Sequence, residues 1–98
     1  MKQLKNIHPG EVLQDEFLVP LGISAYRLSK EIGIPQTRIS QILKGRRRIT
    51  ADTALRLSKF FGNSPKFWLG LQDDFDIEDE LRNRQPEIDQ IKRFDKAA

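Results

Sequence analysis

The sequence predicts an all-α fold. Helix start and stop signals recur along the chain, whereas no segment shows the sustained apolar and polar alternation of a strand bounded by hairpin turns. The 98 residues are 38% hydrophobic and 32% charged, which is typical of one globular domain and not of a disordered chain. The chain contains no cysteine, so its stability must come from packing, without disulfides or thiolate zinc sites.

Two helices are predicted in the N-terminal third. The first should run from about Gly10 to Leu18, and Pro20 and Gly22 should end it. The second should begin after Ser24, whose hydroxyl can cap a helix, and end at Gly33.

The next two helices follow the same signals. Pro35 suits the first turn of a third helix, and Gly45 marks its end. Thr50 is expected to cap a fourth helix, which Gly62 closes. The expected buried positions are Ile39, Ile42 and Leu43 in the third helix and Ala54, Leu57, Phe60 and Phe61 in the fourth.

A fifth helix is predicted in the C-terminal part. Ser64 and Pro65 repeat the start signal of a cap followed by a proline, and the helix is expected to reach about Asn83 before Pro86 interrupts it. Residues 86–98 then form either a short amphipathic helix or a frayed tail.

The spacing over residues 24–44 indicates a helix-turn-helix. Gly33 can adopt the positive φ that the turn needs, and Ser29 is a small side chain where two helices cross. Five apolar side chains take the inward positions: Leu28, Ile32, Ile34, Ile39 and Ile42. The alternative is an ordinary helical hairpin with a solvated polar face.

The outward face of the third helix carries side chains that can read bases, so we expect Pro35–Lys44 to enter the major groove of DNA. Glutamine can bond adenine twice, lysine can donate to guanine, and serine and threonine adapt to either. The candidate base-reading residues are Gln36, Thr37, Ser40, Gln41 and Lys44.

Positive charge is concentrated beside this face. Residues 24–50 hold seven basic side chains and one acidic one, whereas the remaining chain is net negative, with an acidic run at 73–80. The candidate phosphate contacts are Arg27, Arg38, Arg46, Arg47 and Arg48. The alternatives are a solvated loop for the arginine triplet and a surface ion pair for Arg27. The acidic run is either a solvated helix face or a contact to a basic partner.

Several other classes of protein are disfavoured. We find no nucleophile and base set, no metal-ligand spacing and no phosphate-cradling glycine loop, so we expect no catalytic residue, metal or cofactor. His8 is expected to cap the first helix. No stretch approaches the ~20 apolar residues that span a bilayer, and Met1–Gly10 has no apolar run, so we expect a cytoplasmic protein without a membrane partner.

A homodimer is expected because one helix-turn-helix reads only about four or five base pairs, too few to single out one operator. The fifth helix is the best candidate for the joining surface, since it carries more apolar side chains than one side of a short helix can hide. The candidate interface residues are Trp68, Leu71 and Phe75, with Phe75 preferred.

These segments carry a family resemblance. LSKEIGIPQTRISQILKGRRRIT at 28–50 resembles the lambda-repressor-like (Xre) helix-turn-helix family. HPGEVLQDEFLVPLGIS at 8–24 and TADTALRLSKFFGNSPKFWLGLQ at 50–72 are similar to the HigA antitoxins, also called virulence-associated protein I. Residues 1–75 would then be the DNA-binding domain, and 76–98 a C-terminal helical extension or tail.

The resemblance implies a five-helix DNA-binding homodimer that binds a double-stranded operator and represses its own operon. It also implies neutralisation of HigB, a RelE-like mRNA-cleaving toxin. The alternatives are a stand-alone Xre-type regulator without a toxin and a protein-interaction module that has lost DNA binding. The intact polar face and arginine triplet argue against the second alternative.

Overall fold

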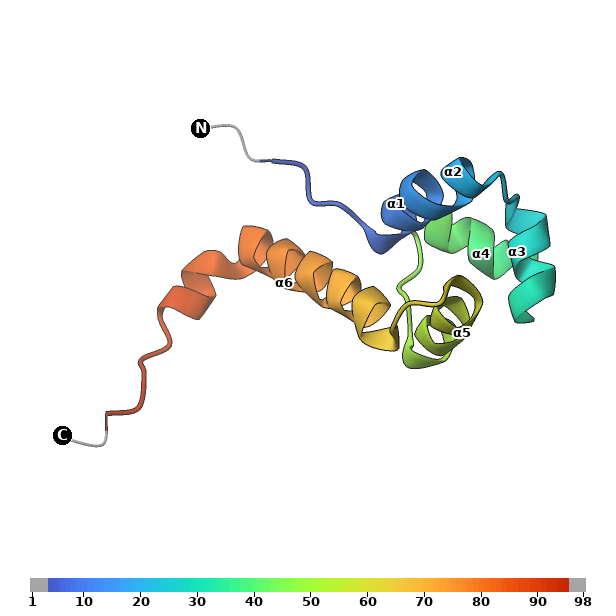
Figure 1. Cartoon of the computed structure of the whole chain (residues 1–98). Coiled ribbons are helices and arrows are strands. Elements are labelled where there is room, and N and C mark those ends of the chain that lie inside the picture. The colour runs from blue at the N-terminus through green and yellow to red at the C-terminus, as the bar shows by residue number, and fades with distance from the viewer. Residues whose placement is uncertain (1–3, 96–98) are drawn as a thin grey trace.

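The computed structural model describes residues 4–95, which form helices joined by short loops (Figure 1). This range contains no strand, which confirms the predicted all-α class, and one continuous helical run followed by four helices makes up the expected five helical segments. The run comprises α1 (Pro9–Val12), η1 (Leu13–Leu18) and α2 (Val19–Leu21), and the four helices are α3 (Ala25–Ile32), α4 (Gln36–Leu43), α5 (Ala51–Phe61) and α6 (Pro65–Asp89).

The first helical run is longer than predicted because it includes Pro20. It begins at His8 as expected, where imidazole Nδ1 accepts a hydrogen bond from the Gly10 N–H at 2.9 Å. Its middle part, η1, is a π-helix, and the Val19 N–H donates to the carbonyl five residues earlier. Proline breaks the hydrogen bond from residue i to residue i−4 of an α-helix, but the π turn before Pro20 already uses i−5 bonds. The run therefore ends only at Gly22, which has a left-handed φ of 65°.

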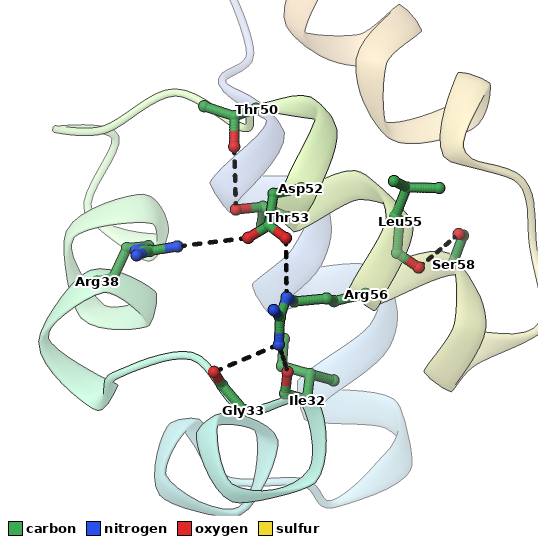
Figure 2. Close-up of polar contacts among 9 residues, drawn as sticks. All are labelled: Ile32, Gly33, Arg38, Thr50, Asp52, Thr53, Leu55, Arg56 and Ser58. Carbon is green, nitrogen blue, oxygen red and sulfur yellow. Dashed lines mark hydrogen bonds and ion pairs between the residues drawn. The ribbon is translucent and has the colours of Figure 1, made fainter.

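Most predicted helix ends are confirmed. Ser24 and Ser64 each accept a hydrogen bond from the N–H three residues later, at 3.0 and 3.1 Å. Thr50 precedes α5 as predicted, but its hydroxyl lies 3.4 Å from that of Thr53 and does not cap the helix (Figure 2). The four glycines predicted to end helices all have positive φ: Gly22, Gly33, Gly45 and Gly62.

The core lies where the first helical run meets α4, α5 and the first half of α6. Trp68 is fully buried there, with the Phe17 ring centroid at 4.9 Å and its indole N–H donating to Asn63 Oδ1 at 3.0 Å. Helices α1 and α4 approach so closely that a Cβ on Gly10 would lie 1.8 Å from the Ile42 carbonyl oxygen. Only glycine therefore allows α4 to sit at this distance from α1.

Helix α6 leaves the core and projects beyond it (Figure 1). The predicted interruption at Pro86 is wrong, since the helix continues to Asp89. Pro86 is exposed, so water can satisfy the carbonyl that its missing N–H leaves without a donor, and the last turns depart from the line of the first ones (Figure 1). Residues 91–95 are not helical, and residues 1–3 and 96–98, which include the end of the predicted tail, lie outside the described range. The division at residue 75 stays a prediction, and it falls inside α6.

The segment before the first helical run lies against the middle of α6. Asn6 Nδ2 donates to the Phe75 carbonyl at 3.0 Å, and the Arg82 guanidinium donates to the Leu4 carbonyl. The His8 and Phe75 rings meet edge-on, with their centroids 4.9 Å apart. Residues 4–8 therefore cover one side of α6 within the same chain.

Candidate nucleic-acid interface

The helix-turn-helix consists of α3, the turn at Gly33 and α4. Gly33 has a φ of 71°, and its N–H and that of Ile34 both donate to the Ser29 carbonyl, at 3.0 and 3.2 Å. Pro35 is the N-cap of α4, one residue before the predicted first turn. The five predicted inward side chains are all buried, which confirms the packing expected of the motif: Leu28, Ile32, Ile34, Ile39 and Ile42.

The outer face of α4 is polar and open to solvent. Four of the five predicted base-reading side chains are exposed, and Ser40 is half-buried. Their spacing places all five on one side of the helix, opposite Ile39 and Ile42. The members of this face are Gln36, Thr37, Ser40, Gln41 and Lys44. Base reading by these residues stays a prediction, and the geometry gives it one continuous accessible surface.

Three of the predicted phosphate-contacting arginines have no carboxylate partner within the described part of the chain. Arg27, Arg46 and Arg47 are exposed, and none of them pairs with an acidic side chain of residues 4–95, so the ion pair considered for Arg27 is not observed there. Arg47 Nη1 donates instead to Gln41 Oε1 at 3.1 Å. The loop after α4 thus places positive charge directly beside the polar face.

The other two arginines are held by carboxylates. Arg48 Nη2 lies 2.8 Å from Asp76 Oδ2, and Arg38 Nη1 lies 3.8 Å from Asp52 Oδ2. Both arginines keep exposed surface, so each can meet a phosphate from the side that its carboxylate leaves open.

A buried glutamine of α6 anchors the arginine loop. Gln72 is 2% exposed, and its Oε1 accepts a hydrogen bond from the Ile49 N–H at 2.8 Å. Its Nε2 donates to Asp76 at 2.9 Å, and Asp76 holds Arg48. Gln72 is absent from the residues predicted from the sequence, although its position one helical turn after Trp68 indicates that it shares the buried side of α6.

A second polar network joins α5 to the helix-turn-helix (Figure 2). Arg56 donates from Nη1 to the Ile32 carbonyl at 2.9 Å and from Nε to Asp52 Oδ1 at 3.0 Å. Arg38 of α4 faces the other oxygen of Asp52 (Figure 2). Asp52 and Arg56 are also absent from the residues predicted from the sequence, although their spacing of four residues on a helix is typical of an ion pair.

The three predicted dimer residues differ in how much surface the single chain leaves open, and the interface itself stays a prediction. Trp68 has no exposed surface because it fills the core of its own chain, so it cannot contact a partner. Leu71 is half-buried against the core, and Phe75 is half-buried and packs on His8 of its own chain. A different side of α6 is open, and it carries Ile77 with 59% of its surface exposed. The exposed apolar surface at Ile77 therefore lies on another side of α6 than Trp68 and Phe75, and a dimer contact of Leu71 or Phe75 stays a prediction.

The His8 imidazole is the titratable group most affected by the fold. Burial lowers the pKa of His8 below its ordinary value, and this effect outweighs the nearby carboxylates of Glu11 and Asp76, which act in the opposite direction. The hydrogen bond from Gly10 N–H to Nδ1 also requires that nitrogen to be unprotonated. His8 is therefore a neutral cap of α1.

The described residues give two further negative findings. No helix within residues 4–95 is long and apolar enough to cross a membrane. In the same range, no three or more His, Cys, Asp or Glu side chains are arranged to hold a metal ion.

Comparisons with known proteins agree with this geometry. A family model described as Helix-turn-helix matches residues 16–68. Virulence-associated protein I of Dichelobacter nodosus is 41% identical over 83 residues, which cover 85% of this chain and 77% of that protein. The structure of an addiction module antidote protein of a HigA family from Coxiella burnetii matches with a TM-score of 0.88 at 46% identity, over 93% of this chain and 100% of that one. The Pseudomonas aeruginosa antitoxin HigA, solved with the higBA promoter, matches with a TM-score of 0.87 at 32% identity, over 92% and 99%.

Proposed function

Since the chain belongs to the helix-turn-helix family and, within it, to the HigA-type antitoxins, we propose that it is a cytoplasmic repressor that binds an operator in its own promoter. In this proposal α4 lies in the major groove and the basic loop 44–50 lies on the sugar-phosphate backbone. Two of the structures named above are an antidote protein of the HigA family and a HigA antitoxin, and the second was solved with promoter DNA.

One observation carries the proposal: the exposed side of α4 is polar over its whole length, and exposed arginines follow it directly. Packing within the chain does not explain this combination, because neighbouring exposed arginines such as Arg46 and Arg47 repel one another unless a negative charge lies nearby. A DNA duplex supplies phosphates for the arginines and base edges for the amides.

We propose that the repressor acts as a homodimer joined through the open side of α6. Ile77, Leu81 and Ile88 recur at helical spacing on this side, and a Cβ on Gly70 of the same side would meet nothing within 4 Å. A second copy can therefore approach closely at Gly70 and cover the three aliphatic side chains. Operator binding by such a dimer requires the two copies of α4 to lie on successive turns of the major groove.

We also propose a HigB-type, RelE-like mRNA-cleaving toxin as the second partner, because the similarity to HigA antitoxins covers most of the chain. Acidic residues of the run at 73–80 that stay exposed on α6 offer a surface of the right sign for a basic toxin. A stand-alone regulator that lacks a toxin is the second candidate.

The test of DNA binding is a titration of labelled promoter DNA and a scrambled duplex of the same composition. We expect tighter binding to the promoter and a logarithmic affinity that falls steeply with logarithmic salt concentration, by about 0.9 per phosphate contact. Equal affinity for the two duplexes, or an affinity that does not depend on salt, would contradict the repressor function.

The toxin is tested separately. The reading frame beside this gene is expressed alone and together with the antitoxin, and growth and mRNA integrity are measured. Growth arrest that co-expression relieves supports the toxin partner. An inert neighbouring product that does not co-purify with this chain leaves the stand-alone regulator as the function.

A further inference from the structure

The turn of the helix-turn-helix is bonded by a side chain from outside the motif. The last carbonyls of a helix lack partners within the helix and need other donors. At the end of α3, Arg56 of α5 provides one: its Nη1 lies 2.9 Å from the Ile32 carbonyl oxygen and 3.5 Å from that of Gly33 (Figure 2). A Cβ on Gly33 would lie 3.1 Å from the same nitrogen, so the glycine also leaves room for this contact.

The same guanidinium continues to the recognition helix. Arg56 Nε donates to Asp52 Oδ1 at 3.0 Å, which leaves Asp52 Oδ2 facing Arg38 Nη1 at 3.8 Å (Figure 2). One carboxylate therefore lies between two guanidinium groups, one from α5 and one from the first turn of α4. The result is a continuous polar chain from the turn, through Arg56 and Asp52, to Arg38.

The position of Arg38 explains what such a chain can do. Arg38 lies on the flank of α4, between the outer-face residue Gln41 and the buried residue Ile42. From a flank, a long side chain can extend toward DNA or fold back along the protein, so its direction decides whether it meets a phosphate. Asp52 restricts that direction, and Arg56 restricts Asp52.

Folding stability is a poor explanation for this arrangement. The side chains of Arg56 and Asp52 are 45% and 58% exposed, and ion pairs this exposed contribute little to stability. The buried aliphatic residues already fix how α3 packs on α4. What those residues leave free is the direction of Arg38.

We propose that Arg56 is a positioning residue for DNA recognition, which contacts no DNA itself but directs Arg38 toward a phosphate through Asp52 and the turn carbonyls. This inference rests on the proposed operator binding. It assigns a role in DNA affinity to a side chain of α5, outside the helix-turn-helix.

The test is a double-mutant cycle on operator affinity. Arg38→Ala should weaken binding about tenfold in the unmodified chain, as expected for loss of one charge-assisted phosphate contact. In an Arg56→Ala background the same substitution should weaken it less than about twofold, because Arg38 is no longer directed. A role of Arg56 in stability alone would leave the two effects additive.

Two further variants isolate the geometry from charge. Arg56→Lys keeps the positive charge but cannot reach the carbonyls and Asp52 together. In this background, too, Arg38→Ala should weaken operator binding less than about twofold. Lys59→Ala is the control, since it removes an exposed positive charge from α5, three residues after Arg56, that bonds neither Asp52 nor the turn carbonyls. It should change neither the operator affinity nor the loss of affinity that Arg38→Ala causes.

The outcomes separate the two levels of the argument. Two results would overturn the positioning role while operator binding stands. The first is additive effects of Arg38→Ala and Arg56→Ala, and the second is a loss of about tenfold from Arg38→Ala that persists in the Arg56→Lys background. If the unmodified chain does not prefer its operator, the proposed function fails, and this inference fails with it. Circular dichroism confirms that each variant is folded, and Arg56→Lys replaces Arg56→Ala if the latter is not.

Discussion

The helix-turn-helix and the outer half of α6 differ in which side of the helix remains exposed to solvent. In α3 and α4 the apolar side is buried and the polar side is left open, whereas beyond Phe75 the open side of α6 carries Ile77 and Ile88 at 59% and 39% exposure. The first surface suits a charged, hydrated partner such as DNA, and the second suits an apolar partner such as another copy of the chain. One small domain thus presents two surfaces of different chemistry, and each can be altered separately.

The largest expected effect comes from breaking the packing beneath α4. Gly10→Ala should lower the free energy of unfolding by about 3 kcal/mol or more, because its Cβ would collide with backbone and not with a flexible side chain. Gly70→Ala is the matched control on α6, where a Cβ meets nothing within 4 Å of the single chain, and it should raise the stability of the monomer by about 0.5–1 kcal/mol when measured at chain concentrations too low for dimerisation. Thermal and urea unfolding measure both, and similar changes in the two variants would refute the difference in packing.

The next effect concerns the open side of α6. Ile77→Asp should yield a folded, helical monomer, with the dimer dissociation constant raised about 100-fold or more, because an unpaired carboxylate would be buried in the interface. Phe75→Asp should instead reduce the stability of the single chain, since Phe75 packs on His8. Analytical ultracentrifugation with circular dichroism distinguishes the two. A dimer that persists in Ile77→Asp would place the interface elsewhere.

A third prediction distinguishes base contacts from phosphate contacts within the polar surface. Gln41→Ala should cost about 1–3 kcal/mol on the operator and little on random DNA, since it removes a base contact. Arg46→Ala should weaken both duplexes alike and reduce the salt slope by about one phosphate contact. Fluorescence anisotropy at several salt concentrations measures both. Equal losses on the two duplexes for Gln41→Ala would remove Gln41 from the base-reading set.

The smallest effect concerns His8, which lies where the N-terminal segment, α1 and α6 meet. Because the fold lowers the pKa of His8, the unfolded chain binds the proton more readily, so stability should rise with pH through this group. Its contribution is complete above pH ~6.5, the ordinary pKa of histidine, and is lost as the pH falls below that value toward the lowered one. His8→Asn keeps a capping group without this titration, so its melting temperature should fall less between pH 7 and pH 5. An identical fall in both proteins would contradict the assignment.

Local chemistry made much of the molecule predictable from sequence. The caps at Ser24 and Ser64, the positive φ of Gly33 and the five inward positions of the helix-turn-helix all follow from residues within a few positions of one another. The errors at Pro20 and Pro86 share one cause. Proline disfavours a helix locally, but a π turn in the first case and solvent exposure in the second removed the penalty.

By itself, then, the sequence determined the helices, their order, the helix-turn-helix and the polar face of α4, because each depends on periodicity and on neighbouring residues. Only the tertiary structure decided that Trp68 lies in the core, that Gln72 anchors Ile49 from 23 residues away, and that Arg56 bonds the carbonyl of Ile32 from 24 residues away. The apolar positions of α6 show both contributions. Their spacing places them on two sides of the helix, one with Trp68 and one with Ile77. The side that faces the core depends on how the first helical run and α5 pack on α6, and the local sequence does not determine this packing.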